Sequence, residues 1–276
     1  MQMSAKQPQP APLTTEQTQQ FMYYWYAARQ AIEEEKYADA YVLLEFCHML
    51  KPDDAQTLYF LGVMYQGLRK NQEALEAFEQ AYRAQKEPHS EELLMRLGNI
   101  YIEQNNWSKA LKIQDELDQV NGYDAMSAIT RYRIYASAGQ PKKALKAIDA
   151  YLETDPTNLR FMLFRIDVLE HLGAKTKVLY EAYDRVLALD PYNLMVLNNY
   201  AYLLATHKGD LKRAERMSEI TIREQPSNAV YLDTYGWILH LQGQNELAKF
   251  YLERALWNAT DDATKEEVTK HLEAIK

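Results

Sequence analysis

The stretch YLDTYGWILHLQGQNELAKFYLERAL, residues 231–256, decides the fold. It predicts two helices joined by a short polar turn, QGQNEL at residues 242–247. A glycine, Gly236, stands in the middle of the first helix, where it costs about 1 kcal/mol relative to alanine. Whatever this glycine contributes to the fold must outweigh that cost.

The same arrangement recurs along the chain. An alanine in the second helix of each pair recurs at Ala40, Ala74, Ala110, Ala144, Ala214 and Ala248, with Leu179 in the remaining place. The successive spacings are 34, 36, 34, 35, 35 and 34 residues. Twelve residues after four of these positions come Pro52, Pro156, Pro191 and Pro226. Proline cannot continue a helix interior, so each one marks a helix boundary.

A small residue also recurs, twelve places before the alanine, as Ala28, Gly62, Gly98 and Gly236. Two antiparallel helices approach closely only where a side chain is missing. Gly236 is therefore expected to lie against Ala248, with the large neighbouring residues interlocked around the contact. Dense packing at this contact outweighs the poor helix propensity of glycine.

At these points the sequence resembles the tetratricopeptide repeat, a helix-turn-helix unit of 34 residues. Residues 58–84, LYFLGVMYQGLRKNQEALEAFEQAYRA, match the family pattern almost position for position. The resemblance covers about residues 21–260. It implies an all-α fold, a right-handed α-solenoid of about seven repeats with a C-terminal capping helix. The repeats are placed near 21–54, 55–88, 91–124, 125–158, 160–193, 194–228 and 229–260.

The ends of the chain differ from the repeats, so the predicted domains are a Pro/Gln-containing flexible tail at 1–14, the repeat domain at 15–260 and a capping helix at 261–276. Thr264 and Glu267 have capping-box spacing at the start of that last helix. Val268, Leu272 and Ile275 share one of its faces and would cover the final apolar surface of a repeat stack.

Two repeats depart from the pattern. In the fourth, Tyr132 stands at the small position. In the fifth, that place falls on Ile166 or Asp167, so its two helices are expected to pack less closely.

Composition narrows the classes of function. The 276 residues include 31 basic and 39 acidic residues, a net charge of -8, with no basic patch, so no nucleic-acid partner is predicted. No apolar run approaches the roughly 20 residues that span a bilayer. The N-terminal stretch resembles the end of a processed export signal. A bacterial periplasmic or envelope location and a cytoplasmic one are therefore both left open.

No catalytic, metal or cofactor residue is predicted. The six histidines are scattered, with no two at metal-ligand spacing on one helix face. There is no glycine-rich phosphate loop. Asp53–Asp54 and Asp261–Asp262 follow helix ends and indicate N-cap chemistry. The single cysteine, Cys47, occupies a small position of the first repeat and is predicted to be a packed, inert thiol.

The resemblance implies a concave groove lined by the first helix of each repeat, where the family holds a peptide or a helix. The fifth position of the repeat gives an apolar row from Trp25 to Leu163, followed by Asn198 and Asp233. The branch of the family that grips a C-terminal carboxylate has lysine and asparagine where this chain has Trp25 and Arg29, so that activity is disfavoured. The candidate groove residues are Trp25, Arg29, Tyr59, Met95, Asn99, Ile129, Arg133, Leu163, Tyr202 and Trp237.

The predicted function is a non-catalytic protein-interaction scaffold that binds an apolar or amphipathic peptide segment in this groove. Two alternatives stay open. One is a structural subunit that self-associates into a homo-oligomer, because the last two repeats resemble those of bacterial tetratricopeptide proteins of envelope or secretion assemblies. The other is a small-ligand binder or an enzyme, which would need converging polar groups that these positions do not supply.

Overall fold

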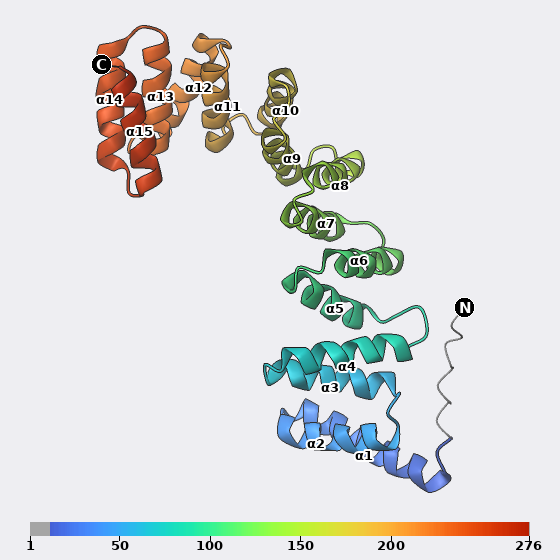
Figure 1. The fold of residues 1–276 in the computed structure, drawn as a ribbon. Helices are drawn as coiled ribbons and strands as arrows, with labels where there is room; N and C mark the ends of the chain where they lie inside the picture. Colours follow the sequence, from blue (N-terminus) through green and yellow to red (C-terminus); the bar gives the residue numbers. More distant parts are fainter. Residues whose placement is uncertain (1–11, 276) are drawn as a thin grey trace, which may run out of the picture. The chain divides into compact units, whose positions relative to one another are not determined.

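The computed structural model describes residues 12–275, and within that range every regular element is an α-helix (Figure 1). The all-α prediction is therefore confirmed. The first eleven residues of the predicted N-terminal tail lie outside the described residues. The helices are α1 Thr15–Glu33, α2 Tyr37–Leu50, α3 Ala55–Gly67, α4 Asn71–Ala84, α5 Glu91–Glu103, α6 Trp107–Asn121, α7 Ala125–Ser137, α8 Pro141–Thr154, α9 Leu159–His171, α10 Thr176–Leu189, α11 Leu194–Thr206, α12 Leu211–Glu224, α13 Ala229–Leu241, α14 Asn245–Asn258 and α15 Asp262–Ala274.

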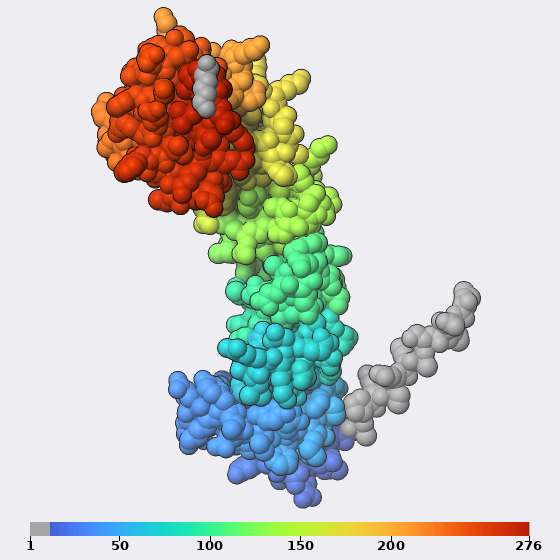
Figure 2. Space-filling model, turned by 60° about the vertical axis from the view of Figure 1, so that its left-hand side comes forward, coloured from blue at the N-terminus to red at the C-terminus, as the bar shows by residue number. Residues whose placement is uncertain are grey.

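The described residues form two compact units, one up to residue 140 with α1 to α7 and one from residue 141 with α8 to α15. The division falls inside the predicted fourth repeat, where Tyr132 stands at the small position. Consecutive helices pack in pairs within each unit, such as α3 with α4 and α13 with α14. As expected for the fifth repeat, α9 and α10 contact each other less extensively than α13 and α14 do. Side chains fill the spaces seen between neighbouring ribbons within each unit (Figure 2).

The recurrent glycine lies where the two helices of a pair come closest. A Cβ atom placed on Gly236 would lie 3.2 Å from the backbone oxygen of Ala248 and 2.7 Å from Cγ of Leu252. The expected contact with Ala248 is thus present, and the Leu252 side chain approaches even more closely. Gly62 repeats the arrangement, with Phe78 in the place of Leu252. These glycines admit a large buried side chain from the second helix.

The turn inside each helix pair has one conformation throughout. A residue with positive φ recurs at Glu35, Arg69, Asn105, Gly139, Gly173, Lys208 and Gly243. The next residue donates its backbone N–H to the carbonyl five places earlier, as from Lys70 to Tyr65 and from Gln244 to Leu239, each at 2.9 Å. This pattern is the Schellman ending of a helix, which normally selects glycine at the left-handed residue. Four of the seven turns here use another residue.

Asparagine or aspartate caps the start of most first helices. Asp54, for example, accepts a hydrogen bond from the backbone N–H of Thr57 at 3.0 Å, as its position after a helix end indicated. The predicted cap of α15 was wrong in one respect. Asp261, not Thr264, is its N-cap, because the Asp261 carboxylate accepts from the Thr264 N–H at 2.9 Å. The helix therefore begins at Asp262, and Glu267 does not take part in capping it.

Helix α15 covers the last helix pair, lying beside α13 and α14 (Figure 1). Val268 is fully buried in one cluster with Leu232 and Leu252, and Leu272 and Ile275 pack at its edge. The apolar face predicted to cover the last repeat is therefore the face of α15 that packs against it. In residues 12–275, no helix combines the length and the apolar character that crossing a lipid bilayer requires.

Candidate functional site

The first unit contains a pocket of about 240 Å³ between α5, α6 and α7. Its apolar lining comes from side chains of all three helices, and its polar lining includes three carboxylates. The apolar residues are Met95, Ile102, Ile113, Leu117 and Met126, and the acidic residues are Glu91, Asp118 and Asp124. Gly98 and Ala110, the small residues of the third repeat, also line the pocket.

The pocket exists because the third repeat lacks one large apolar side chain. The residue four places after the recurrent alanine packs against the first helix, as Phe78 and Leu252 do against Gly62 and Gly236. In the third repeat this residue is Gln114. A Cβ atom on Gly98 would meet only Ile113, at 3.3 Å. The surface beside Gly98 is therefore left open.

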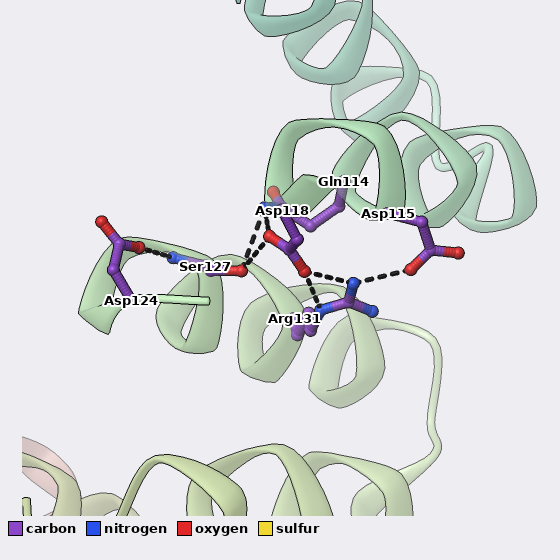
Figure 3. Close-up of polar contacts among 6 residues, drawn as sticks. All are labelled: Gln114, Asp115, Asp118, Asp124, Ser127 and Arg131. Atoms are coloured by element: carbon purple, nitrogen blue, oxygen red, sulfur yellow. Dashed lines mark hydrogen bonds and ion pairs between the residues drawn. The ribbon is translucent and has the colours of Figure 1, made fainter. Parts of the chain in front are cut away.

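Gln114 turns instead toward polar partners on α6 and α7 (Figure 3). It is buried, and its Nε2 donates to Oδ1 of Asp118 at 2.7 Å and to Oγ of Ser127 at 3.2 Å. Ser127 also donates its hydroxyl to Asp118, and its backbone N–H donates to the N-cap Asp124. The amide nitrogen of Gln114 is thus held by Asp118 and Ser127, and the surface beside Gly98 is left open.

Arg131 closes the other end of this network (Figure 3). Its guanidinium donates to Asp115 at 2.6 Å and to Asp118, with Nε at 3.1 Å from Oδ2. Burial alone would lower the pKa of Arg131, but the hydrogen bonds to the two carboxylates raise it above its usual value. Both members of the Arg131–Asp118 pair are largely buried. The network ties α7 to α6 and fixes the wall of the pocket.

Of the predicted groove residues, Met95 and Asn99 line this pocket, and both are exposed. On α7, Ile129 is half-buried and Arg133 is exposed, and neither lines it. In the second unit, Leu163 of α9 is half-buried.

Trp25 and Tyr59 are half-buried against aromatic rings of the core. Trp25 meets Phe60 edge-on with ring centroids 5.6 Å apart, and Tyr59 contacts both Phe60 and Phe78. Arg29, although exposed, stands over the Phe60 ring at 5.3 Å. The contact of Trp25 with Phe60 therefore joins the first and second helix pairs, whereas the ring contacts of Tyr59 lie within the second pair.

Tyr202 and Trp237, the candidates nearest the C-terminus, face the capping helix α15. The Tyr202 hydroxyl lies 3.5 Å from Oε1 of Glu267, and the Trp237 ring stacks on His271 with centroids 4.3 Å apart. The sequence contained no signal for these contacts. The small polar or amide residues at Gln114 and Ser218 were visible in the sequence, four places after the recurrent alanine, but the pocket beside Gln114 was not foreseen.

Two family models of the tetratricopeptide repeat match the chain, at residues 66–125 and 131–193. Together with paired helices in tight contact at small residues, these matches define a helical repeat protein. The chain is a tetratricopeptide-repeat protein with an all-α solenoid fold, and in general terms a protein-interaction scaffold.

The chain is similar to part of two longer curated proteins. It is 23% identical over 219 residues to human protein O-mannosyl-transferase TMTC1, covering 78% of this chain. It is 29% identical over 160 residues to a TPR repeat-containing protein of Pseudomonas aeruginosa, covering 56% of this chain. The chain spans only 24% and 26% of the length of these two proteins.

Solved structures share the fold at low identity. A C-terminal part of a TPR repeat-containing protein from Cytophaga hutchinsonii is 15% identical, with a TM-score of 0.62 over 90% of this chain and 98% of its own. A chain of the Naa15/Naa10 complex bound to HypK-THB has 13% identity and a TM-score of 0.66 over 95% of this chain and 46% of its own. YrrB, a TPR protein with an unusual peptide-binding site, has 19% identity and a TM-score of 0.53 over 71% of this chain and 99% of its own.

Proposed function

We propose that this protein is a non-catalytic scaffold that holds an amphipathic peptide segment, with one apolar side chain of that segment seated in the pocket between α5, α6 and α7. The observation that carries the proposal is the pocket opened by Gln114 beside Gly98. At about 240 Å³ it is smaller than the roughly 300 to 1,000 Å³ of sites for drug-sized ligands. This size favours a side chain over an independent small molecule.

The lining supports an occupant with a basic residue next to its apolar one. Met95 and Met126 are exposed at the pocket, and methionine adapts to varied apolar partners. Glu91 and Asp124 lie at the same pocket and are exposed, so they favour a Lys or Arg on the bound segment. The same acidic groups, with the net charge of -8, disfavour a nucleic-acid partner.

The test fills the pocket and leaves the exposed side chains of Met95, Glu91 and Asp124 unchanged. Gln114→Leu restores a large apolar residue at the place held by Phe78 and Leu252 in other repeats. Peptides selected from a displayed random library against the native protein are expected to lose affinity for this variant by about tenfold or more, equivalent to roughly 1.4 kcal/mol. Fluorescence anisotropy with each labelled peptide measures the change.

A matched control lies on the same helix. Gln119 is exposed and does not line the pocket, so Gln119→Leu adds the same side chain without filling it. Peptide affinity should be unchanged in this variant. Equal affinity of the native protein and a folded Gln114→Leu variant would show that the peptides bind elsewhere, and the proposal would then be abandoned.

One observation favours the self-association alternative. Helix α14 exposes Leu247, Phe250 and Trp257, and Trp257 is 89% exposed. Apolar residues gathered on one helix indicate a contact surface. Light scattering after size exclusion would detect the oligomer, and Trp257→Ser should return it to a monomer. A monomeric native protein would rule this alternative out.

A further inference from the structure

Three potential metal ligands meet between α13 and α15 in the second unit. Asp233 comes from α13, and Glu267 and His271 lie one turn apart on α15. One ligand atom from each side chain lies within 4.8 Å of the other two. Nδ1 of His271 is 2.8 Å from Oδ1 of Asp233, and Asp233 is only 6% exposed. The sequence analysis predicted no metal ligand here, because Glu267 and His271 lie 34 and 38 positions after Asp233 and meet it only in the folded chain.

The surroundings hold two of these ligands in place. The Trp237 ring stacks on His271 at an interplanar angle of 18°, which fixes the plane of the imidazole. The Tyr202 hydroxyl lies beside the Glu267 carboxylate. Neighbours that orient a ligand ring or a ligand carboxylate are typical of metal sites in proteins.

A second, independent observation comes from Asn198 of α11. Its side chain lines the same pocket of about 290 Å³ as Asp233 and Glu267. Asn198 is 4% exposed, and its Oδ1 has no hydrogen-bond partner among the described residues. Leaving a buried acceptor unpaired costs about 1 to 3 kcal/mol. Asn198 Oδ1 is therefore available to accept a hydrogen bond from a group bound in the pocket.

We propose that Asp233, Glu267 and His271 bind one divalent transition-metal ion of the zinc class. One imidazole nitrogen and two carboxylate oxygens form a ligand set that zinc accepts, with remaining coordination positions open to water. Such a water has protons to donate to Asn198 Oδ1. The cation takes the place of the hydrogen bond between Nδ1 of His271 and Oδ1 of Asp233, any displaced proton passes to solvent, and coordination bonds join α15 to α13.

This site would be structural. Metal binding holds α15 against α13, where His271 stacks on Trp237 and Glu267 lies beside Tyr202. It therefore stabilises the packing of the capping helix on the first helices of the last two repeats. Zinc is expected to raise the melting temperature of the protein, because a ligand that binds only the folded state stabilises that state.

The test uses the untagged full chain after dialysis against a chelator. Titration with zinc chloride by isothermal calorimetry, followed by elemental analysis of the dialysed complex, should give one zinc ion per chain. His271→Ala and Glu267→Gln should each abolish this binding at micromolar zinc. Glu266→Gln is the matched control, because Glu266 is the neighbouring carboxylate and pairs with Lys270 at 2.6 Å. It should leave the stoichiometry at one.

A second measurement reports the place of binding. Copper(II), a quenching ion for the same ligand set, should quench tryptophan fluorescence in the native chain, and most of that quenching should vanish in Trp237→Phe. Circular dichroism of each variant shows that the helices are retained. No zinc uptake by the native chain, or uptake that survives both His271→Ala and Glu267→Gln, would overturn the proposal.

Discussion

Gly62 of α3 lies directly against the aromatic ring of Phe78 of α4, so close that a Cβ atom on the glycine would come within 2.6 Å of Cε1 of that ring. Phe78 is fully buried, so its ring is surrounded by other atoms of the core. Gly62→Ala is therefore expected to destabilise the protein by about 1 to 3 kcal/mol, the usual cost of overpacking. Urea unfolding followed by circular dichroism measures the loss.

The same helix provides the control. Gly67 ends α3, and a Cβ atom there would meet nothing within 4 Å. Gly67→Ala should raise stability by about 0.4 to 1 kcal/mol, because alanine restricts the unfolded chain. If both substitutions had the same effect, the close contact with Phe78 would not explain the recurrent glycine.

Arg69 has φ of 58°, a left-handed conformation that glycine adopts without steric cost. Arg69→Gly should therefore stabilise the protein by about 1 kcal/mol, and Gly243→Ala, at φ 81°, should destabilise it by a similar amount. Asn105→Gly should have a smaller effect, because asparagine tolerates this conformation better than arginine. Thermal unfolding of the three variants tests the order, and a loss of stability in Arg69→Gly would contradict the argument.

Cys47 is completely buried, and burial with the nearby Asp54 carboxylate raises the pKa of its thiol to about 11. The unfolded thiol titrates near 9.0. Between about pH 9 and about pH 11 the unfolded state binds fewer protons than the folded state. The free energy of unfolding should then fall as pH rises, by at most about 1.4 kcal/mol per pH unit from this group.

Tyrosines titrate in the same alkaline range, so Cys47→Ala isolates the thiol. The difference in unfolding free energy between the native protein and this variant should shrink or change sign above about pH 9 and level off above about pH 11. Ellman's reagent should react slowly with the native thiol near neutral pH and rapidly in denaturant. Rapid reaction with the folded protein would show that Cys47 is accessible.

Asp118 and Asp115 both accept hydrogen bonds from Arg131, but only Asp118 is largely buried. Asp118→Asn should cost about 1.5 to 3 kcal/mol, because a charge-assisted hydrogen bond is lost and the buried guanidinium loses its main counter-charge. Asp115→Asn should cost no more than about 1 kcal/mol, as expected for an exposed partner. Urea unfolding compares the two, and equal losses would show that burial does not separate them.

The recurrent alanine and the small residue twelve places before it predict the helix pairs well. They depend on contacts within one repeat, whose two helices lie close together in the chain. Gly236 against Ala248 is such a contact. The apolar face of α15 around Val268 follows in the same way from the helical spacing of residues within that one helix. Short sequence separation makes these relationships readable from spacing alone.

The candidate site was predicted less well. Trp25 and Tyr59 have the residue type of a binding surface. The Trp25 ring, however, packs against Phe60 of the next helix pair, a contact that repeat spacing does not reveal, and the Tyr59 ring packs against Phe78 of its own pair. The pocket depends on one side chain, Gln114, turning toward Asp118. The contact of His271 with Asp233 depends on how the capping helix packs against α13. Each of these outcomes is decided by tertiary packing rather than by local pattern.

The left-handed turn has a consequence for how such chains diverge. Seven turns keep one backbone conformation with glycine, arginine, lysine, glutamate or asparagine at its centre. Mutational drift can exchange these residues at about 1 kcal/mol each while the geometry persists. The two family models match up to residue 193, whereas helix pairs continue through α14 to Asn258. The turns at Lys208 and Gly243 therefore keep the geometry of the repeat beyond the last residue that the family models match.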